Sequence, residues 1–299
     1  MPVAAFDLLA TRDLPGFARA NGWTYDAVAK PLDRTAGPAQ LSAAVLSTGL
    51  AYDRIAGNGW EVGRLIAGGN PNQAASVVGR PVTPADYGIP EGIGLGYLAI
   101  TMARNLPQMI LKSTADGRDP WIGVFKRPAK GQEMLLEGDF NSHFRLFVPN
   151  GYERDALYIF TPDLMALLID ETGDLDVEVK DNHLIVYRAA GFNLTDPATW
   201  ARFERIHATV GAKAWRQTDM YQDPRGGGSP TRFDDRTASN AVGPVGVRLR
   251  TRLSKFATIA VAVMAGFFVV PGIVWFAGFV FMMITATQVA PGSSITWSY

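Results

Sequence analysis

Three side chains in one short stretch could carry out acid–base chemistry. Glu137, Asp139 and His143 lie in the sequence EGDFNSH. A carboxylate beside an imidazole can transfer protons near neutral pH, so this trio could serve a membrane-bound hydrolase. The same spacing is more typical of a solvated turn that leads into a strand. We treat the trio as the catalytic hypothesis, and the sequence as a whole leans against an enzyme.

The other motifs that would indicate catalysis, a metal or a cofactor are absent from the sequence. His183 and His207 do not belong to HxH or HExxH spacings. The acidic run between residues 170 and 181 lacks the order of an EF-hand loop. There is no GxSxG elbow and no phosphate-binding P-loop. The chain has no cysteine, which excludes disulfides, thiolate zinc sites and cysteine nucleophiles. We therefore expect no cofactor and no metal site.

Charge is unevenly distributed along the chain. All 28 acidic residues precede Arg236, and residues 1–235 carry a net charge of −5 from 23 basic and 28 acidic side chains. Nucleic-acid binding requires a basic face, so this acidic part of the chain argues against nucleic-acid partners.

Residues 256–287 form an apolar run of thirty-two residues without a single charge. About 20 such residues cross the hydrocarbon core of a bilayer as a helix, so the run predicts a C-terminal transmembrane segment. Four basic residues precede it, and such clusters stay on the cytoplasmic side; they are Arg248, Arg250, Arg252 and Lys255. The N-terminus shows no signal peptide. Both observations place the N-terminal domain in the cytoplasm.

The number of membrane crossings depends on Pro271 and Gly272, which lie at the midpoint of the run. A single helix would be kinked there, because proline cannot donate its backbone hydrogen bond. A hairpin would leave two arms of about 22 Å each, at about 1.5 Å per residue. Those arms fall short of a full span, so one tilted span is favoured over the hairpin.

The remaining chain has the pattern of an α+β domain with a largely antiparallel sheet and a few packed helices. Capping residues, N-terminal prolines and terminal glycines predict helices at residues 13–21, 161–173 and 196–211. Apolar alternation or short apolar runs predict strands at residues 60–66, 95–102, 108–112, 144–148 and 156–160, with a turn at 103–107 and a hairpin at 176–179 and 183–187. Strands in runs with few helices between them favour an antiparallel sheet over βαβ winding.

These elements divide the chain into four parts. The predicted parts are a cytosolic domain at 1–215, with a candidate subdomain boundary near 70–92; a flexible linker at 216–247; the basic flank and transmembrane segment at 248–287; and a short uncharged tail at 288–299.

One long stretch resembles a family of bacterial membrane-associated proteins of unknown function. It reads LEGDFNSHFRLFVPNGYERDALYIFTPDLMALLIDE and is followed by DVEVKDNHLIVY. The shared pattern includes Phe140 and Phe144, the alanine and tyrosine at 156 and 158, and the threonine-proline helix start that leads to Met165. The resemblance is best over residues 130–210 and implies a location at a bacterial plasma membrane. It implies no catalytic residues.

The sequence therefore predicts a cytosolic binding or scaffold module held at the inner face of the plasma membrane, with the bilayer and a protein as partners. Two alternatives stay open. One is the hydrolase that would use Glu137, Asp139 and His143. The other is a sensor of anionic lipid that would use the basic flank.

The membrane segment yields a first test. After lysis without detergent, the full-length protein is expected in the membrane pellet and should resist extraction with high salt and carbonate, because lipid solvates residues 256–287. Recovery of the intact chain in the soluble fraction would contradict this expectation.

Overall fold

The computed structural model describes residues 6–29, 50–66, 95–115, 126–226 and 241–251, together with Gly278 and Met282. The chain divides into two units, Met1–Thr251 and Arg252–Tyr299. The fold described below is that of the first unit, which we call the head.

The first half of the head is rich in strands and the second half is rich in helices. The described strands are β1 (Thr24–Ala29), β2 (Leu50–Gly57), β3 (Trp60–Ile66), β4 (Leu95–Ser113), β5 (Glu133–Met134), β6 (Phe144–Phe147) and β7 (Asp176–Arg188). The described helices are α1 (Asp7–Ala10), α2 (Leu14–Ala20), α4 (Phe140–His143), α5 (Glu153–Ile159), α6 (Pro162–Thr172), α7 (Pro197–Ile206), the π-helical turn η4 (His207–Gly211), α8 (Ala212–Thr218) and α9 (Pro244–Val247).

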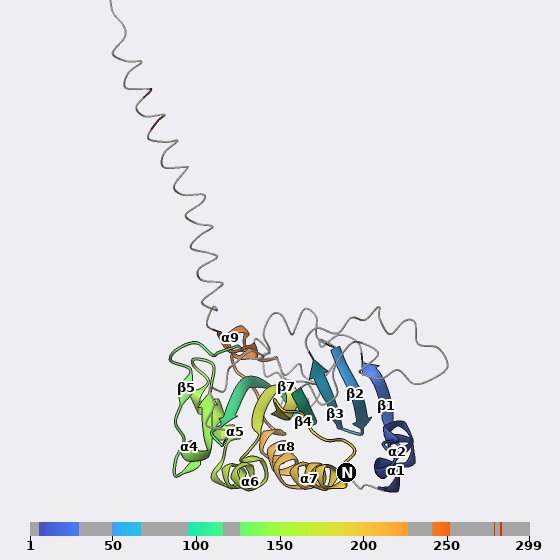
Figure 1. The fold of residues 1–299 in the computed structure, drawn as a ribbon. Coiled ribbons are helices and arrows are strands. Elements are labelled where there is room, and N and C mark those ends of the chain that lie inside the picture. Colours follow the sequence, from blue (N-terminus) through green and yellow to red (C-terminus); the bar gives the residue numbers. More distant parts are fainter. Residues whose placement is uncertain are drawn as a thin grey trace, which may run out of the picture. The chain divides into compact units, whose positions relative to one another are not determined.

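The described strands form one sheet, and β4 is its central member. The order is β1-β2-β3-β4-β6-β5, and β7 also pairs with β4. Every one of these pairings is antiparallel. The first half of β4 lies between β3 and β7, and its last residues lie between β7 and β6. The predicted α+β class with a largely antiparallel sheet is thereby confirmed (Figure 1).

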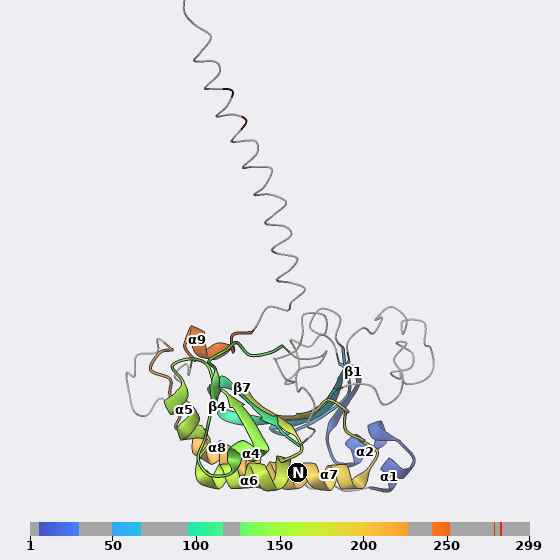
Figure 2. The ribbon, with the colours of Figure 1, turned by 60° about the vertical axis from the view of Figure 1, so that its left-hand side comes forward.

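One face of the sheet is covered by helices, and the main core lies between the two layers. Figure 2 shows α6, α7 and α8 along this face, with α9 on the opposite side of the sheet. Trp200 of α7 is fully buried there, and its ring lies 4.9 Å from that of Phe17 and 5.4 Å from that of Trp23. These contacts join α2 and α7 to the start of the sheet, and aromatic side chains bury a large apolar area each.

The opposite face of the sheet mixes apolar and charged side chains, and we call it the polar face. Its apolar members form a second, smaller cluster that includes Tyr97, Ile185 and Tyr187. Between them the strands carry buried polar residues at alternate positions, which are Glu61, Gln108, Lys112, Asp176, Glu178 and Lys180. Because side chains alternate across a strand, the neighbouring residues Val62, Val177 and Val179 enter the main core instead.

Two predicted turns are corrected by this sheet. The hairpin predicted at 176–187 is a single strand, β7, and the turn predicted at 103–107 lies inside β4. The two turn signals fall in one irregular stretch of the pairing, where the β4–β7 register shifts between Thr101 and Leu106 and again between Leu106 and Met109. Asp181, the partner of Leu106, has φ 51°. Both strands continue past this bulge because their hydrogen bonding resumes on the other side of it.

One strand prediction and one helix prediction also change. Residues 156–160, predicted as a strand, belong mostly to α5, where Glu153 and Asp155 in the first turn favour a helix N-terminus. The helix predicted to end at Gly211 continues through η4 into α8. Gly211 allows close packing, because a Cβ there would lie 2.9 Å from Ile100 Cδ1 of β4.

The C-terminal predictions fall partly outside the described residues. No helix within the described ranges is both long enough and apolar enough to cross a membrane. The predicted segment 256–287 lies outside those ranges except for Gly278 and Met282, and the candidate subdomain boundary near 70–92 lies outside them as well. Within the range predicted as a linker, residues 216–226 and 241–247 are described as part of the head.

The aromatic core gives a second test. Trp200→Ala is expected to lower the free energy of unfolding by about 3–5 kcal/mol, because it removes a fully buried indole. Trp215→Ala is the matched control, since Trp215 of α8 is 45% exposed and its loss should cost about 1 kcal/mol or less. Urea unfolding of the purified full-length protein, followed by circular dichroism, compares the two. Equal losses would contradict the described core.

Candidate functional site

Glu61 of β3 is the centre of a polar cluster on the polar face. Its Oε1 accepts a hydrogen bond from the Tyr97 hydroxyl at 2.8 Å. Its Oε2 accepts two from Arg54, at 2.9 Å from Nε and 2.6 Å from Nη2. Arg54 Nη1 donates to Asp26 at 2.8 Å. Glu61 is only 8% exposed, so this carboxylate is both buried and fixed in orientation.

Beside this cluster the polar face is hollowed by an open pocket of about 190 Å³. Its polar lining comes from β2, β3, β4 and β7 and consists of Arg54, Glu61, Thr101 and His183. The other lining residues are Ala56, Gly57, Gly59, Trp60 and Ala99. Because most of these are small, the charged and polar groups define the chemistry of the pocket. The convergence of these polar groups in one hollow makes it the candidate binding site.

His183 is the pocket residue whose hydrogen bonding is incomplete. Its Nδ1 is buried, and no hydrogen-bond partner for it occurs within the described residues. Burial, with a smaller contribution from Lys180, lowers the pKa of His183, so the imidazole is neutral at pH 7. A buried polar atom without a partner costs about 1–3 kcal/mol, which a ligand or a water molecule can recover. The Nδ1 atom of His183 is therefore a hydrogen-bonding group that the described structure leaves unused.

Further along β7, charged residues on the polar face are paired across the β4–β7 ladder. Gln108 Nε2 donates to Glu178 Oε1 at 2.7 Å. Lys112 forms an ion pair with Asp176. Burial lowers the pKa of Lys180, against the opposing influence of Glu178 and Asp181. The two pairs fix the register of β4 against β7 and with it the position of His183.

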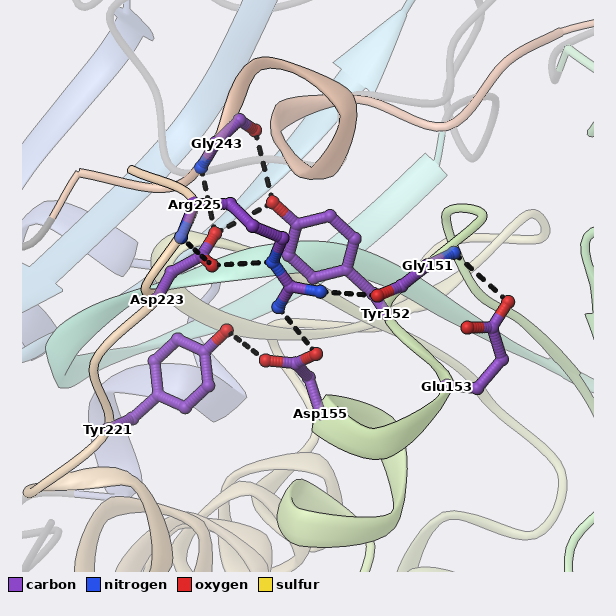
Figure 3. A network of polar contacts seen from close by, with 8 residues as sticks. All are labelled: Gly151, Tyr152, Glu153, Asp155, Tyr221, Asp223, Arg225 and Gly243. Atoms are coloured by element: carbon purple, nitrogen blue, oxygen red, sulfur yellow. Dashed lines mark hydrogen bonds and ion pairs between the residues drawn. The ribbon is translucent and has the colours of Figure 1, made fainter. Parts of the chain in front are cut away.

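A second polar cluster, drawn in Figure 3, joins α5 to residues 221–225 and to Gly243. The side chain of Asp223 is fully buried. It accepts hydrogen bonds from Tyr152 Oη at 2.7 Å, Gly243 N at 2.8 Å and Arg225 Nε at 2.7 Å. The Arg225 guanidinium lies 3.6 Å from the centroid of the Tyr152 ring and also pairs with Asp155 at 2.6 Å. The polar groups of this cluster are hydrogen-bonded to one another. The cluster therefore has a structural role: it joins α5 to residues 221–225 and to Gly243.

The electrostatics of this cluster agree with a structural role. Burial by itself would raise the pKa of Asp223, but hydrogen bonds from Gly243 N–H, Tyr152 and Arg225 outweigh it and hold that pKa below the usual range. Burial and the hydrogen bond to Asp223 raise the pKa of Tyr152 to about 12. The carboxylate therefore stays ionised and the phenol stays protonated, which keeps Gly243 in place at neutral pH.

Residues 241–251, which include Gly243 and which we call the strap, are attached to the polar face. Leu249 N donates to Gln108 Oε1 at 2.7 Å, and Leu249 is 4% exposed. Arg250 N donates to Gln132 Oε1 at 3.0 Å, while Gln132 Nε2 donates to Arg250 O at 2.7 Å. The backbone of the strap is thus joined to two glutamine side chains of the head.

The two described residues of the basic flank, Arg248 and Arg250, differ in their side-chain contacts. Arg248 makes a bidentate ion pair with Asp181 of β7, with both N–O distances at 2.9 Å. The side chain of Arg250 is exposed. Arg252 and Lys255 lie outside the described residues. Arg248 is therefore committed to the head, which the spacing of the basic residues alone does not reveal.

The three residues of the catalytic hypothesis lie on an exposed part of the head. His143 Nε2 is 3.9 Å from Asp139 Oδ2, and the two side chains are 40% and 84% exposed. Glu137 is exposed as well, and none of the three lines the pocket. Because the three side chains are exposed and do not converge on a pocket, this geometry does not favour the hydrolase alternative. Among the described residues no group of His, Asp or Glu side chains is placed to hold a metal ion.

The pocket is not evident from the sequence because its residues are far apart and belong to no motif. The sequence identifies His183 only as the start of a strand and gives no signal that Arg54 or Glu61 belongs to a site. The period-two alternation of charges in DVEVK indicates only the polar face, since it places Asp176, Glu178 and Lys180 on one face of a strand, and none of these three residues lines the pocket.

The chain matches no protein-family model and no curated protein sequence. Among solved structures it is similar to the crystal structure of the mycobacterial trehalose monomycolate transport factor A, TtfA, with 14% sequence identity and a TM-score of 0.40. The similarity covers 71% of this chain and 93% of that chain. At that identity and TM-score it assigns neither fold nor function here.

The cluster around Asp223 gives a third test. Asp223→Asn is expected to lower the free energy of unfolding at pH 7 by about 2 kcal/mol, because it weakens several hydrogen bonds to a buried charge. The folded-state pKa of Asp223 is depressed, so its contribution is present above about pH 4, near the pKa of an unfolded aspartate. That contribution is lost as the pH falls through the lower folded-state pKa, and the difference between variant and wild type should shrink there.

Asp139→Asn is the control, because the Asp139 side chain is 84% exposed and its loss should leave stability nearly unchanged. Unfolding curves at neutral pH and in acid provide the comparison. A difference that stays constant on acidification would exclude ionised Asp223 as the source of the stabilisation.

Proposed function

We propose that this chain is a membrane-tethered binding protein, with the pocket on the polar face as its ligand site. The observation that carries the proposal is the pocket itself, whose lining combines His183, a residue with a buried Nδ1 that has no partner in the described structure, with the fixed pair of Arg54 and Glu61. We infer that a polar group of a small ligand, or of a partner protein, hydrogen-bonds to the His183 imidazole in this pocket.

The arrangement of the pocket favours recognition over catalysis. Both carboxylate oxygens of Glu61 are engaged, Oε1 by the Tyr97 hydroxyl and Oε2 by Arg54, so the side chain is held in one orientation. Arg54 in turn is oriented by Glu61 on one side and Asp26 on the other. Thr101 adds a hydroxyl to the lining. Fixed polar groups around a neutral imidazole select a ligand by its hydrogen-bonding pattern.

The proposed tether is the apolar run 256–287, and the strap supports this part of the proposal. The backbone of the strap is hydrogen-bonded to the head as far as Arg250, and Thr251 pairs with Pro128. The apolar run begins at Phe256, so the intervening chain reaches at most about 18 Å, at about 3.5 Å per residue. The head would therefore operate close to the inner surface of a bacterial plasma membrane. This location accords with the resemblance over residues 130–210.

A photo-crosslinking experiment tests the ligand site. Ala56 lines the pocket and is replaced by p-benzoylphenylalanine in the full-length chain, which is then irradiated in intact cells. A defined crosslinked product is expected from this position. The same replacement at Leu135, which is 75% exposed and does not line the pocket, provides the matched control.

Substitutions of His183 then distinguish a ligand that binds in the pocket from a molecule that is merely near position 56. His183→Leu should reduce the product about tenfold, the effect of about 1.4 kcal/mol from one lost hydrogen bond. His183→Asn keeps a polar group near the position of Nδ1 and should retain most of the product. Identical products from positions 56 and 135, or equal yields from the two His183 variants, would reject the pocket as the site.

A further inference from the structure

The strap brings together two basic segments that are far apart in the sequence. Ala129 N donates to Arg250 O at 2.7 Å, and Pro128 pairs with Thr251 in an antiparallel bridge. Gln132 adds the double hydrogen bond to the backbone of Arg250 described above. Residues 126–132 therefore lie directly beside the end of the strap.

This pairing creates a surface rich in positive charge, which we call the basic edge. It consists of Lys126, Arg127, Lys130 and Arg250. The side chains of Arg127, Lys130 and Arg250 are exposed, and Lys126 is partly exposed. Residues 126–132 read KRPAKGQ and residues 241–251 read AVGPVGVRLRT, so neither segment contains an acidic residue. Four cations from two distant segments are thus brought to one edge of the head, although residues 1–235 carry a net charge of −5.

Two acidic residues close to these segments form ion pairs with arginines that lie outside the basic edge. Asp181, which lies beside the strap, pairs with Arg248. Glu133, the first acid after residue 132, pairs with Arg145, with an Nε–Oε1 distance of 2.8 Å. Both carboxylates are therefore engaged by arginines that do not belong to the edge, while Lys126 and Arg127 have interactions of their own.

We propose that the basic edge binds the surface of an anionic phospholipid bilayer. The inference rests on the tether proposed above: a membrane fits better than other anionic partners because the edge ends at Thr251 and the uncharged run begins at Phe256. Lysine and arginine next to a membrane segment attract anionic head groups, and the attraction is screened by salt. The basic edge shares no residue with the ligand pocket. It also differs from the basic flank, since Arg248 pairs with Asp181 and residues 126–130 come from a distant part of the sequence.

The test uses the full-length chain in lipid nanodiscs, and the absence of cysteine makes site-specific labelling simple. A single cysteine is introduced by Val245→Cys, at a position of α9 that is 48% exposed, and carries an environment-sensitive fluorophore. Discs contain either phosphatidylcholine alone or phosphatidylcholine with phosphatidylglycerol. A blue shift and quenching by head-group-labelled lipid are expected in the anionic discs only, and high salt should reverse them.

Two triple variants complete the experiment. Arg127→Gln, Lys130→Gln and Arg250→Gln together should return the signal in anionic discs to the level of the neutral discs. The matched control removes three exposed cations elsewhere on the head, by Arg19→Gln, Arg154→Gln and Arg216→Gln, and should keep the shift. Co-elution of protein with the discs confirms insertion in every case, and circular dichroism confirms folding. A signal that is independent of lipid charge, or an equal loss in both triple variants, would overturn the proposal.

Discussion

The side chain of Gln108 connects three parts of the head: β4, β7 and the strap. It is fully buried, and its two ends have different partners. The amide nitrogen donates to Glu178 of β7 at 2.7 Å, and the amide oxygen accepts from Leu249 N of the strap at 2.7 Å. One residue of β4 thus fixes the neighbouring strand and the outgoing chain at the same time. A shorter or apolar side chain would leave a buried carboxylate and a buried N–H each short of a hydrogen bond, which is more costly than the loss of one contact.

The polar face shows how a sheet tolerates charge without exposing it. Buried ion pairs contribute little net stability, because desolvation offsets most of their attraction. Their effect here is to fix the register of β4 against β7. The pair of Lys112 with Asp176 and the contact of Gln108 with Glu178 form only in one register of β4 against β7. A slip would separate the partners, so the charges select the pairing that also places His183 in the pocket.

Local signals and long-range pairing explain what the sequence could and could not predict. Asp13 and Asp196 accept backbone hydrogen bonds at the starts of α2 and α7, as their capping positions indicate, because capping depends on a few adjacent residues. The continuous β7 was not predictable, since Asp181 resembles a turn until a partner strand pairs on both sides of it. The strand predicted at 156–160 proved to be helical for a similar reason: a short apolar run does not by itself distinguish a strand from a helix. The pocket and the basic edge depend on residues from separate segments, so spacing within any one segment could not show them.

Asp181 links the strap to β7 through its ion pair with Arg248. A non-glycine residue with φ 51° is in a conformation that L-amino acids disfavour, and its carboxylate is held by both terminal nitrogens of Arg248. Asp181 is two residues from His183, which lines the pocket, so this ion pair fastens the outgoing chain to the same strand that forms one wall of the pocket.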